Sequence, residues 1–215
     1  MGGSSLGAEA IYSFLNRKIR KKFSFVNNID LSRNKNNKIN QFNIIISKSG
    51  NTLETLTNLN YQKVKKNCLF ITENKNSYLR NLALKLKSEI IEHNNFIGGR
   101  YSVLSETGMI PAFFMGLEPN NFKRLDNLIS SNKFINMLTY NVSSIFSFHQ
   151  KKKNNSIILN YDENSNNLFY WYQQLVAESL GKSSKGILPI VSPVPKDNHS
   201  VCLLYTSDAA DDTRS

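Results

Sequence analysis

The stretch Ser47-Lys48-Ser49-Gly50-Asn51-Thr52-Leu53-Glu54-Thr55 is the part of the sequence around which the rest is organised. The run before it, 42–46, is apolar and β-branched, which predicts a buried strand. The run after it, to about residue 66, places leucines at helical spacing and predicts an amphipathic helix. The chain therefore passes from strand to helix through a short loop of Ser, Gly, Asn and Thr.

Such a loop can bind an anion. The first backbone N–H groups of a helix have no partner within the helix, and together with the helix dipole they attract negative charge. Lys48 adds a positive charge beside the loop. The alternative is an ordinary helix N-cap, with Ser49 or Thr52 as the capping residue. This stretch alone leaves both interpretations open.

The composition indicates a globular protein with a basic surface. The 215 residues carry a formal charge of +11, with 40% hydrophobic and 20% charged residues. A charge of this size would suit a nucleic-acid partner. However, the lysines lie among asparagines, as in 34–38 and 151–155, without the interleaved aromatic residues of a base-stacking surface. We therefore expect a solvated basic surface and no nucleic-acid partner.

Targeting segments and metal-ligand patterns are not found in the sequence. No apolar run is long enough to span a bilayer, and no signal peptide opens the chain. Cys68 and Cys202 have no metal-ligand spacing around them. We expect a reduced, cytoplasmic protein without a membrane or metal site. His93 and His149 lie among lysines and asparagines and are expected at the surface.

Short apolar runs alternate with amphipathic runs along the chain, and a glycine- and serine-rich turn is expected at 2–7. Strands are predicted at 22–26, 42–46, 68–72 and 157–159, and helices at 8–15, 53–66, 77–87, 106–115, 121–149 and 164–180. This alternation favours an α/β fold in which helices cover both faces of a parallel sheet. A boundary between two α/β units is predicted near residue 105.

A second anion-binding candidate is Gly98-Gly99-Arg100-Tyr101-Ser102. Paired glycines let the backbone approach a ligand closely, and the arginine could clamp an anion. The alternative is a tight turn with an arginine at the surface.

A candidate general base lies in the last predicted helix. Gln174 and Glu178 are four residues apart and so share a face, and Gly181 follows at the expected C-cap. A carboxylate in the last turn meets the negative end of the helix dipole, which disfavours its charged form and makes it more basic. The alternative is an exposed surface glutamate. A phosphate-binding P-loop ending at 181–183 is excluded, because Val176 stands where that motif needs its first glycine.

The end of the chain contains one more candidate and a change of composition. His199 follows a proline-rich turn and could serve as an acid–base group or simply be exposed. From residue 202 to 215 lysine and asparagine vanish, and small and acidic residues replace them. This segment is interpreted as a non-native, adapter-derived tail rather than a natural acidic tail, and is excluded from fold reasoning.

Taken together, five motifs in a fixed order resemble the phosphoglucose (glucose-6-phosphate) isomerase family over residues 1 to 201. They are Gly2-Gly3-Ser4-Ser5-Leu6-Gly7, the 47–55 stretch, Gly98-Gly99-Arg100-Tyr101-Ser102, the 174–182 segment Gln-Leu-Val-Ala-Glu-Ser-Leu-Gly-Lys, and His199-Ser200. The resemblance implies two sugar-isomerase (SIS) domains, each a three-layer α/β sandwich around a parallel sheet. The first would be nearly complete at 1–105, and the second would be truncated at 106–201.

The resemblance also implies a reaction and a set of roles. The reaction is the interconversion of glucose 6-phosphate and fructose 6-phosphate through an enediolate, without a metal or organic cofactor. In this family pattern Ser47, Lys48, Ser49 and Thr52 would hold the phosphate, while Gly3 and Ser4 would line the sugar. Arg100 would stabilise the enediolate, Gln174 would position the substrate and Glu178 would be the base. His199 would assist ring opening at the site of the neighbouring subunit in a homodimer.

Two departures and two alternatives accompany this interpretation. This sequence has no counterpart of the family's initial strand and N-terminal helices. It also has no counterpart of the lysine and glutamine that the family carries on a late, C-terminal helix. The chain itself is therefore expected to be an inactive fragment. One alternative is a non-catalytic SIS module that binds a phosphosugar, which would need neither Glu178 nor Arg100. The other is a bifunctional phosphoglucose/phosphomannose isomerase, which the sequence does not separate.

Overall fold

The computed structural model describes residues 3–27, 29, 41–62, 67–182 and 185–197. Within these ranges the strands form two parallel sheets. The first sheet has the order β1-β2-β3, and the second pairs β4 with β5. Their bounds are β1 (Asn43–Ile46), β2 (Cys68–Thr72), β3 (Glu89–Glu92), β4 (Asn155–Asn160) and β5 (Leu188–Pro193). The α/β class with parallel strands is therefore confirmed.

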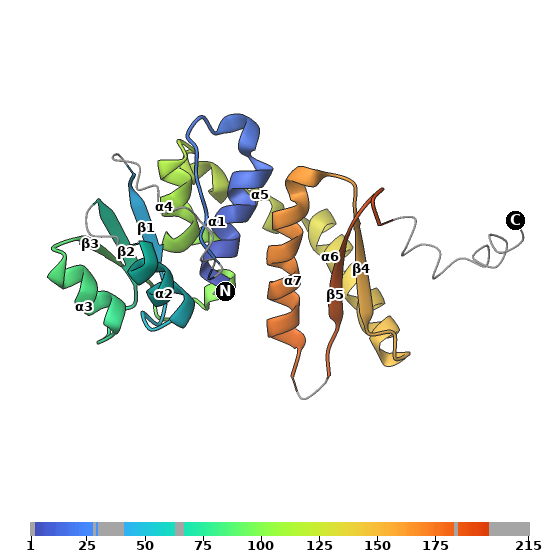
Figure 1. Cartoon of the computed structure of the whole chain (residues 1–215). Coiled ribbons are helices and arrows are strands. Elements are labelled where there is room, and N and C mark those ends of the chain that lie inside the picture. The colour runs from blue at the N-terminus through green and yellow to red at the C-terminus, as the bar shows by residue number, and fades with distance from the viewer. Residues whose placement is uncertain (1–2, 28, 30–40, 63–66, 183–184, 198–215) are drawn as a thin grey trace, which may run out of the picture.

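Helices connect the strands and cover them (Figure 1). The α-helices are α1 (Gly3–Phe14), α2 (Leu53–Gln62), α3 (Tyr78–Lys85), α4 (Glu106–Phe114), α5 (Leu125–Ile129), α6 (Asn132–Gln150) and α7 (Asn166–Leu180). Short 3₁₀ segments are η1 (Asn16–Lys18), η2 (Gly99–Leu104), η3 (Pro119–Arg124) and η4 (Glu163–Ser165). Parallel strands need such crossover connections, which is why each strand of the first sheet is followed by a helix.

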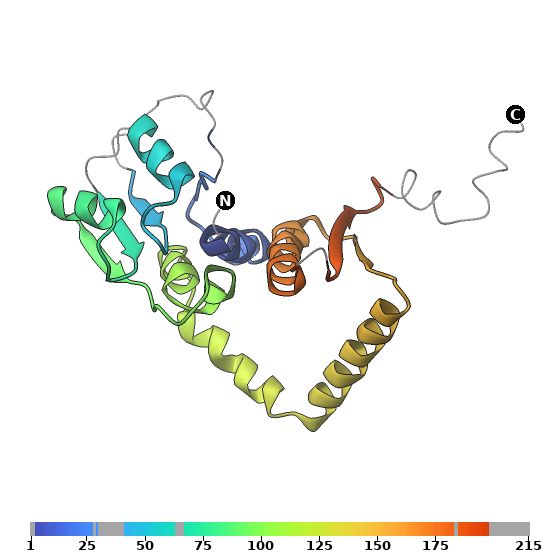
Figure 2. The same cartoon turned by 90° about the horizontal axis from the view of Figure 1, so that it is seen from below.

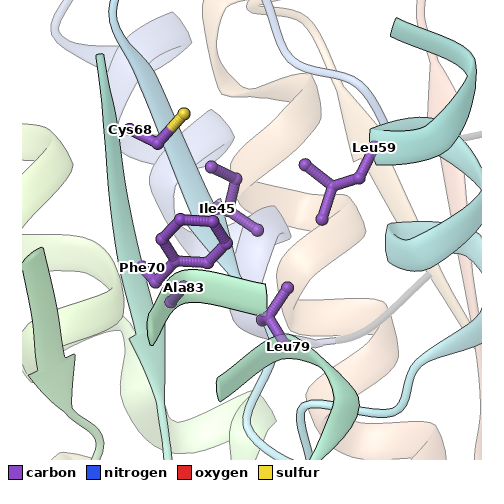
Figure 3. Close-up of a cluster of buried hydrophobic side chains, with 6 residues drawn as sticks. All are labelled: Ile45, Leu59, Cys68, Phe70, Leu79 and Ala83. Atoms are coloured by element: carbon purple, nitrogen blue, oxygen red, sulfur yellow. The ribbon is translucent and has the colours of Figure 1, made fainter. Parts of the chain in front are cut away.

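The core of the first sheet is centred on β2, whose five residues are all buried. Cys68 and Phe70 point to the face that α2 and α3 cover, where they meet Leu59, Leu79 and Ala83 (Figure 3). Successive side chains of a strand point to opposite faces. The remaining apolar residues of β2 therefore face the side on which α1 and α4 lie (Figures 1 and 2). A strand buried on both faces reads as a continuous apolar run, as predicted.

A second cluster joins α1 to α4. Ile11 of α1 packs with Ala112 and Met115 of α4, and Phe23 and Phe25 pack against this cluster. The strand predicted at 22–26 is therefore wrong, because these residues have no strand conformation and pair with no strand in the part of the chain that the structure describes. Their alternating apolar pattern is explained by contact with the helices: the rings of Phe23 and Phe25 lie close to the Tyr12 ring, at 5.8 and 5.6 Å between centroids.

The second half of the chain is built differently. Helix α7 packs against β5 on one side and against α1 on the other, so it joins the two halves. Helix α6 contains no buried residue among those described, and Figure 2 shows it, in gold, running outside the body formed by α1, α4 and α7. No helix in the described part of the chain is long and apolar enough to cross a membrane.

Several element boundaries differ from the sequence-based expectation. Gly3 to Gly7 lie inside α1 rather than in a turn before it. The helix expected at 121–149 is broken, and α6 begins where the Ser131 side chain accepts a hydrogen bond from the Phe134 backbone N–H. Strands β3 and β5 were not predicted. Glutamates bound the short β3, and prolines, which cannot donate to the ladder, lie at two positions of β5.

Candidate active site

Three hydroxyl groups meet at the carboxyl end of β1. Ser47 Oγ lies 2.8 Å from Thr52 Oγ1, and Ser49 Oγ lies 3.5 Å from the same atom. Ser47 is buried, and its Oγ accepts a hydrogen bond from the Gly50 backbone N–H at 3.2 Å. We name Ser47, Ser49, Gly50 and Thr52 the hydroxyl cradle. The residues predicted to surround an anion thus lie together at the start of α2.

The shape of the cradle depends on Gly50. Its φ is +67°, a left-handed conformation that other residues rarely adopt, and a Cβ there would lie 2.2 Å from Ser77 Oγ. Ser77 is the N-cap of α3, where its hydroxyl accepts from the Arg80 backbone N–H. Asn51 adds a second link, because its Oδ1 accepts from the Tyr78 backbone N–H at 3.0 Å. The cradle is therefore fitted against the first turn of α3.

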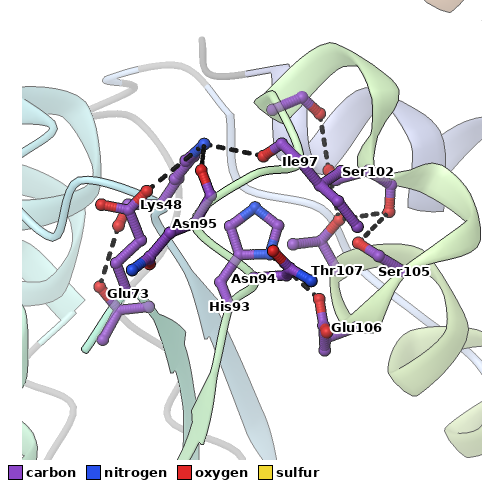
Figure 4. A network of polar contacts seen from close by, with 12 residues as sticks. Lys48, Glu73, His93, Asn94, Asn95, Ile97, Ser102, Ser105, Glu106 and Thr107 are labelled. Atoms are coloured by element: carbon purple, nitrogen blue, oxygen red, sulfur yellow. Dashed lines mark hydrogen bonds and ion pairs between the residues drawn. The ribbon is translucent and has the colours of Figure 1, made fainter.

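Lys48 connects the cradle to the loop that leads into Gly98-Gly99. Its ammonium donates to the backbone carbonyls of Asn95 and Ile97, at 3.1 and 2.8 Å, and lies 3.3 Å from a Glu73 carboxylate oxygen (Figure 4). Glu73 is buried and also pairs with Lys75. The hydrogen bond from Lys75, helped by that from Lys48 and opposed by burial, holds the pKa of Glu73 below its usual value. The Lys48 charge is therefore already paired with a carboxylate.

Arg100, Gln174 and Glu178 come together from opposite halves of the chain. Arg100 Nη1 lies 3.5 Å from Glu178 Oε2, and Gln174 Nε2 donates to Glu178 Oε1 at 2.6 Å. Trp171 Nε1 donates to the Arg100 backbone carbonyl at 3.0 Å, which fixes this residue against α7. The predicted clamp and the predicted base are thus direct neighbours, while Gln174 shares the base's helix face as expected. Because Lys48 bonds to Ile97, the cradle and Arg100 are tied to one short loop.

His93 was missed by sequence reasoning. It follows β3 and is only 2% exposed, so the prediction of a surface histidine is wrong. Its Nδ1 lies 3.1 Å from Glu106 Oε2 at the start of α4 (Figure 4). Burial acts to raise the pKa of Glu106, but the hydrogen bond with His93 and those with Ser105 and the backbone outweigh it, and the pKa lies below its usual value. The signal was hidden because the short strand β3 itself was not predicted.

The remaining predicted residues are placed only in part. Gly3 opens α1 and Ser4 follows it, and α1 packs against α7, the helix that carries Glu178. His199 and the 202–215 segment lie outside the described residues. Over the ranges that the structure describes, no three His, Cys, Asp or Glu side chains are grouped so as to hold a metal ion.

Comparison with known proteins connects this geometry to a family. A family model described as phosphoglucose isomerase matches residues 1–188. The chain belongs to the phosphoglucose isomerase family. Among curated members, "Glucose-6-phosphate isomerase" of Methanocaldococcus jannaschii is 34% identical over 98% of this chain and 56% of its own length. The Campylobacter jejuni protein of that name is 31% identical over 93% of this chain and 54% of its own.

Solved structures agree on the phosphoglucose isomerase-type fold. A hypothetical protein from Thermus thermophilus superposes with a TM-score of 0.79 at 23% identity, covering 96% of this chain and 55% of the other. A glucose-6-phosphate isomerase from Chlamydia trachomatis gives 0.65 at 20% identity, covering 94% and 45%. The chain spans about half the length of the curated relatives it matches.

Proposed function

We propose that the protein is a glucose-6-phosphate isomerase, which interconverts glucose 6-phosphate and fructose 6-phosphate. The observation that carries the proposal is the constellation of Arg100, Gln174 and Glu178, where a guanidinium and a carboxamide both contact one carboxylate. Membership of the phosphoglucose isomerase family supports it, as do the names of the relatives from M. jannaschii and C. jejuni.

In the proposed reaction Glu178 transfers one proton between two adjacent carbons. The carboxylate takes the proton from the carbon next to the carbonyl. The electron pair of that C–H bond forms the C=C bond, and the π pair of the carbonyl moves onto its oxygen, giving an enediolate. The Arg100 guanidinium stabilises the negative charge that develops there. One proton passes between the two oxygens of the enediolate, so that the former hydroxyl oxygen carries the negative charge. Protonated Glu178 then returns its proton to the former carbonyl carbon as the new carbonyl forms, which completes the aldose–ketose exchange. Gln174 orients the Glu178 carboxylate through its hydrogen bond and positions the substrate beside it.

The phosphate of the substrate is assigned to the hydroxyl cradle. The hydroxyls of Ser47, Ser49 and Thr52 converge beside a helix start, where hydrogen-bond donors favour an anion. Lys48 contributes positive potential while it holds the loop at Ile97. Gly3 and Ser4, at the start of α1, are assigned to the sugar.

The assembly is also part of the proposal. We assign two SIS domains, 1–105 and 106–201, to a cytoplasmic homodimer in which His199 assists ring opening at the neighbouring subunit's site. The tail at 202–215 is proposed to be foreign. Because the relatives are about twice as long, we expect the 215-residue chain alone to show no turnover.

The test is incubation of the natural gene product that contains this chain with fructose 6-phosphate in D₂O. Formation of glucose 6-phosphate with deuterium at the carbon next to the carbonyl is expected. Binding without conversion would instead indicate the non-catalytic phosphosugar module. Equal conversion of mannose 6-phosphate would indicate the bifunctional phosphoglucose/phosphomannose isomerase. Turnover by the isolated 215-residue chain would contradict the expectation that it is incomplete.

A further inference from the structure

Ser179 is the residue next to the proposed base, and its hydroxyl lies where the two halves of the chain meet. Its Oγ accepts a hydrogen bond from Arg100 Nε at 2.9 Å and lies 2.6 Å from the Tyr101 hydroxyl. Both partners belong to η2, while Ser179 belongs to the last turn of α7. None of the roles proposed above uses this side chain.

The chemistry of the contact fixes its direction. Arg100 Nε can only donate, so Ser179 Oγ must be the acceptor. The guanidinium is planar, so holding Nε also sets the direction of Nη1, which lies 3.5 Å from Glu178 Oε2. One hydroxyl therefore aims the cation at the neighbouring carboxylate.

Tyr101 completes this arrangement. The hydrogen bond with Ser179, followed by the one with Arg100, holds the pKa of Tyr101 below its usual value. The Arg100 guanidinium carbon also lies 4.8 Å from the centroid of the Tyr101 ring. The guanidinium is thus held at Nε by Ser179 and along one face by an aromatic ring, while its Nη1 lies towards Glu178.

We propose that Ser179 is a positioning residue for the isomerisation: its hydroxyl holds Arg100 in the orientation in which the guanidinium stabilises the enediolate beside Glu178. This inference rests on the proposed function. Electrostatic stabilisation is effective when the donor is oriented before the reaction, because no reorganisation is then needed at the transition state. Since the phosphate is assigned to the separate hydroxyl cradle, loss of the Ser179 hydroxyl should slow turnover while leaving substrate binding intact.

The test compares Ser179→Ala with Ser179→Thr, which keeps the hydroxyl, in the natural gene product that contains this chain. A hydrogen bond to a charged group is strong enough that Ser179→Ala should lower kcat about tenfold to hundredfold with KM nearly unchanged. Ser179→Thr should recover most of kcat. The control is Ser144→Ala on α6, which removes a serine hydroxyl bonded only to the Tyr140 carbonyl among its described contacts and should change neither constant.

A double-mutant cycle separates positioning from a general structural effect. Arg100→Lys removes the Nε donor, so adding Ser179→Ala to Arg100→Lys should cause little further loss. Losses that multiply independently would overturn the inference, as would a raised KM with unchanged kcat. If the alanine variant does not fold, Ser179→Cys takes its place: the thiol is a weak acceptor, so kcat should again fall with KM nearly unchanged. An inactive wild type overturns the proposed function together with this inference, whereas an active wild type with a fully active Ser179→Ala overturns this inference alone.

Discussion

Strand β2 and helix α6 are both rich in apolar residues, but their surroundings differ. Each of the five residues of β2 is buried, because β1 and β3 pair with its edges and helices cover its faces. None of the described residues of α6 is buried, although Phe146 and several other large apolar side chains occur along it. The difference teaches that the spacing of apolar residues specifies whether a segment forms a strand or a helix. Whether that segment is buried depends on which other parts of the molecule pack against it.

The candidate active site combines residues from the well-packed first half of the chain with residues from the more exposed second half. The hydroxyl cradle follows β1 in the well-packed first half, and Glu178 lies on α7, which has no buried residue among those described. Arg100 connects the two, because it belongs to the first half and contacts Glu178 of the second. Binding should therefore depend on the first half and proton transfer on the contact between the halves.

The largest effect is expected from Glu178→Gln. The amide keeps the size of the side chain but cannot accept a proton, and general acid–base catalysis is worth about 10²–10⁴-fold. Turnover of fructose 6-phosphate by the natural gene product should fall at least that far, and deuterium uptake should fall with it. Phosphosugar binding, measured by calorimetry, should persist. Near wild-type exchange in this variant would place the base elsewhere.

The contrast in burial is tested by Phe70→Ala against Phe146→Ala. The Phe70 side chain is fully buried, at 0% exposure, so its removal should destabilise the fold by about 3–5 kcal/mol. The Phe146 side chain is 59% exposed, and its removal should change stability by less than about 0.5 kcal/mol and reduce self-association. Denaturant unfolding and light scattering measure the two quantities. Equal destabilisation would mean that α6 is packed in solution.

Removal of the cradle hydroxyls should affect binding rather than turnover. If the cradle binds the phosphate as proposed, Ser49→Ala and Thr52→Ala each lose a donor to that charged group, at about 1.5–3 kcal/mol per bond. KM for both hexose phosphates should rise accordingly, while kcat stays close to wild type. Thr55→Ala, which lies in the first turn of α2 and outside the cradle, is the matched control. An unchanged KM in both cradle variants would remove them from the phosphate site.

The smallest effect concerns pH and the carboxylate that pairs with Lys48. The pKa of Glu73 in the folded protein lies below its ordinary value of 4.5, so its stabilising contribution is present above that value. It is lost as the pH falls through the lower folded pKa. Wild type should therefore exceed Glu73→Gln in stability by about 1 kcal/mol or less near neutral pH, and the difference should shrink in acid. Glu89→Gln, at the exposed start of β3, controls for the change of charge.

The sequence allowed the main strands, the α/β class and the residues of the cradle to be predicted, because these follow from local patterns. The meeting of Arg100 with Glu178 could not be deduced from spacing, since 78 residues separate them. It was expected only through the family resemblance. The burial of His93 was missed because this residue follows β3, a short strand that was not predicted, and its partner Glu106 lies 13 residues further along the chain. The apolar alternation at 22–26 was misread because the same pattern suits contact with helices.

The close fit of Gly50 against Ser77 has a consequence for recombination. Gly50 lies in the connection before β2 and Ser77 in the connection after it, but the two residues pack directly against each other. A chimaera with a breakpoint between them would combine a cradle from one parent with an α3 start from another. Because a single added carbon at position 50 would collide with the Ser77 hydroxyl, exchange between homologues should succeed when the block from β1 to the first turn of α3 is moved as one piece.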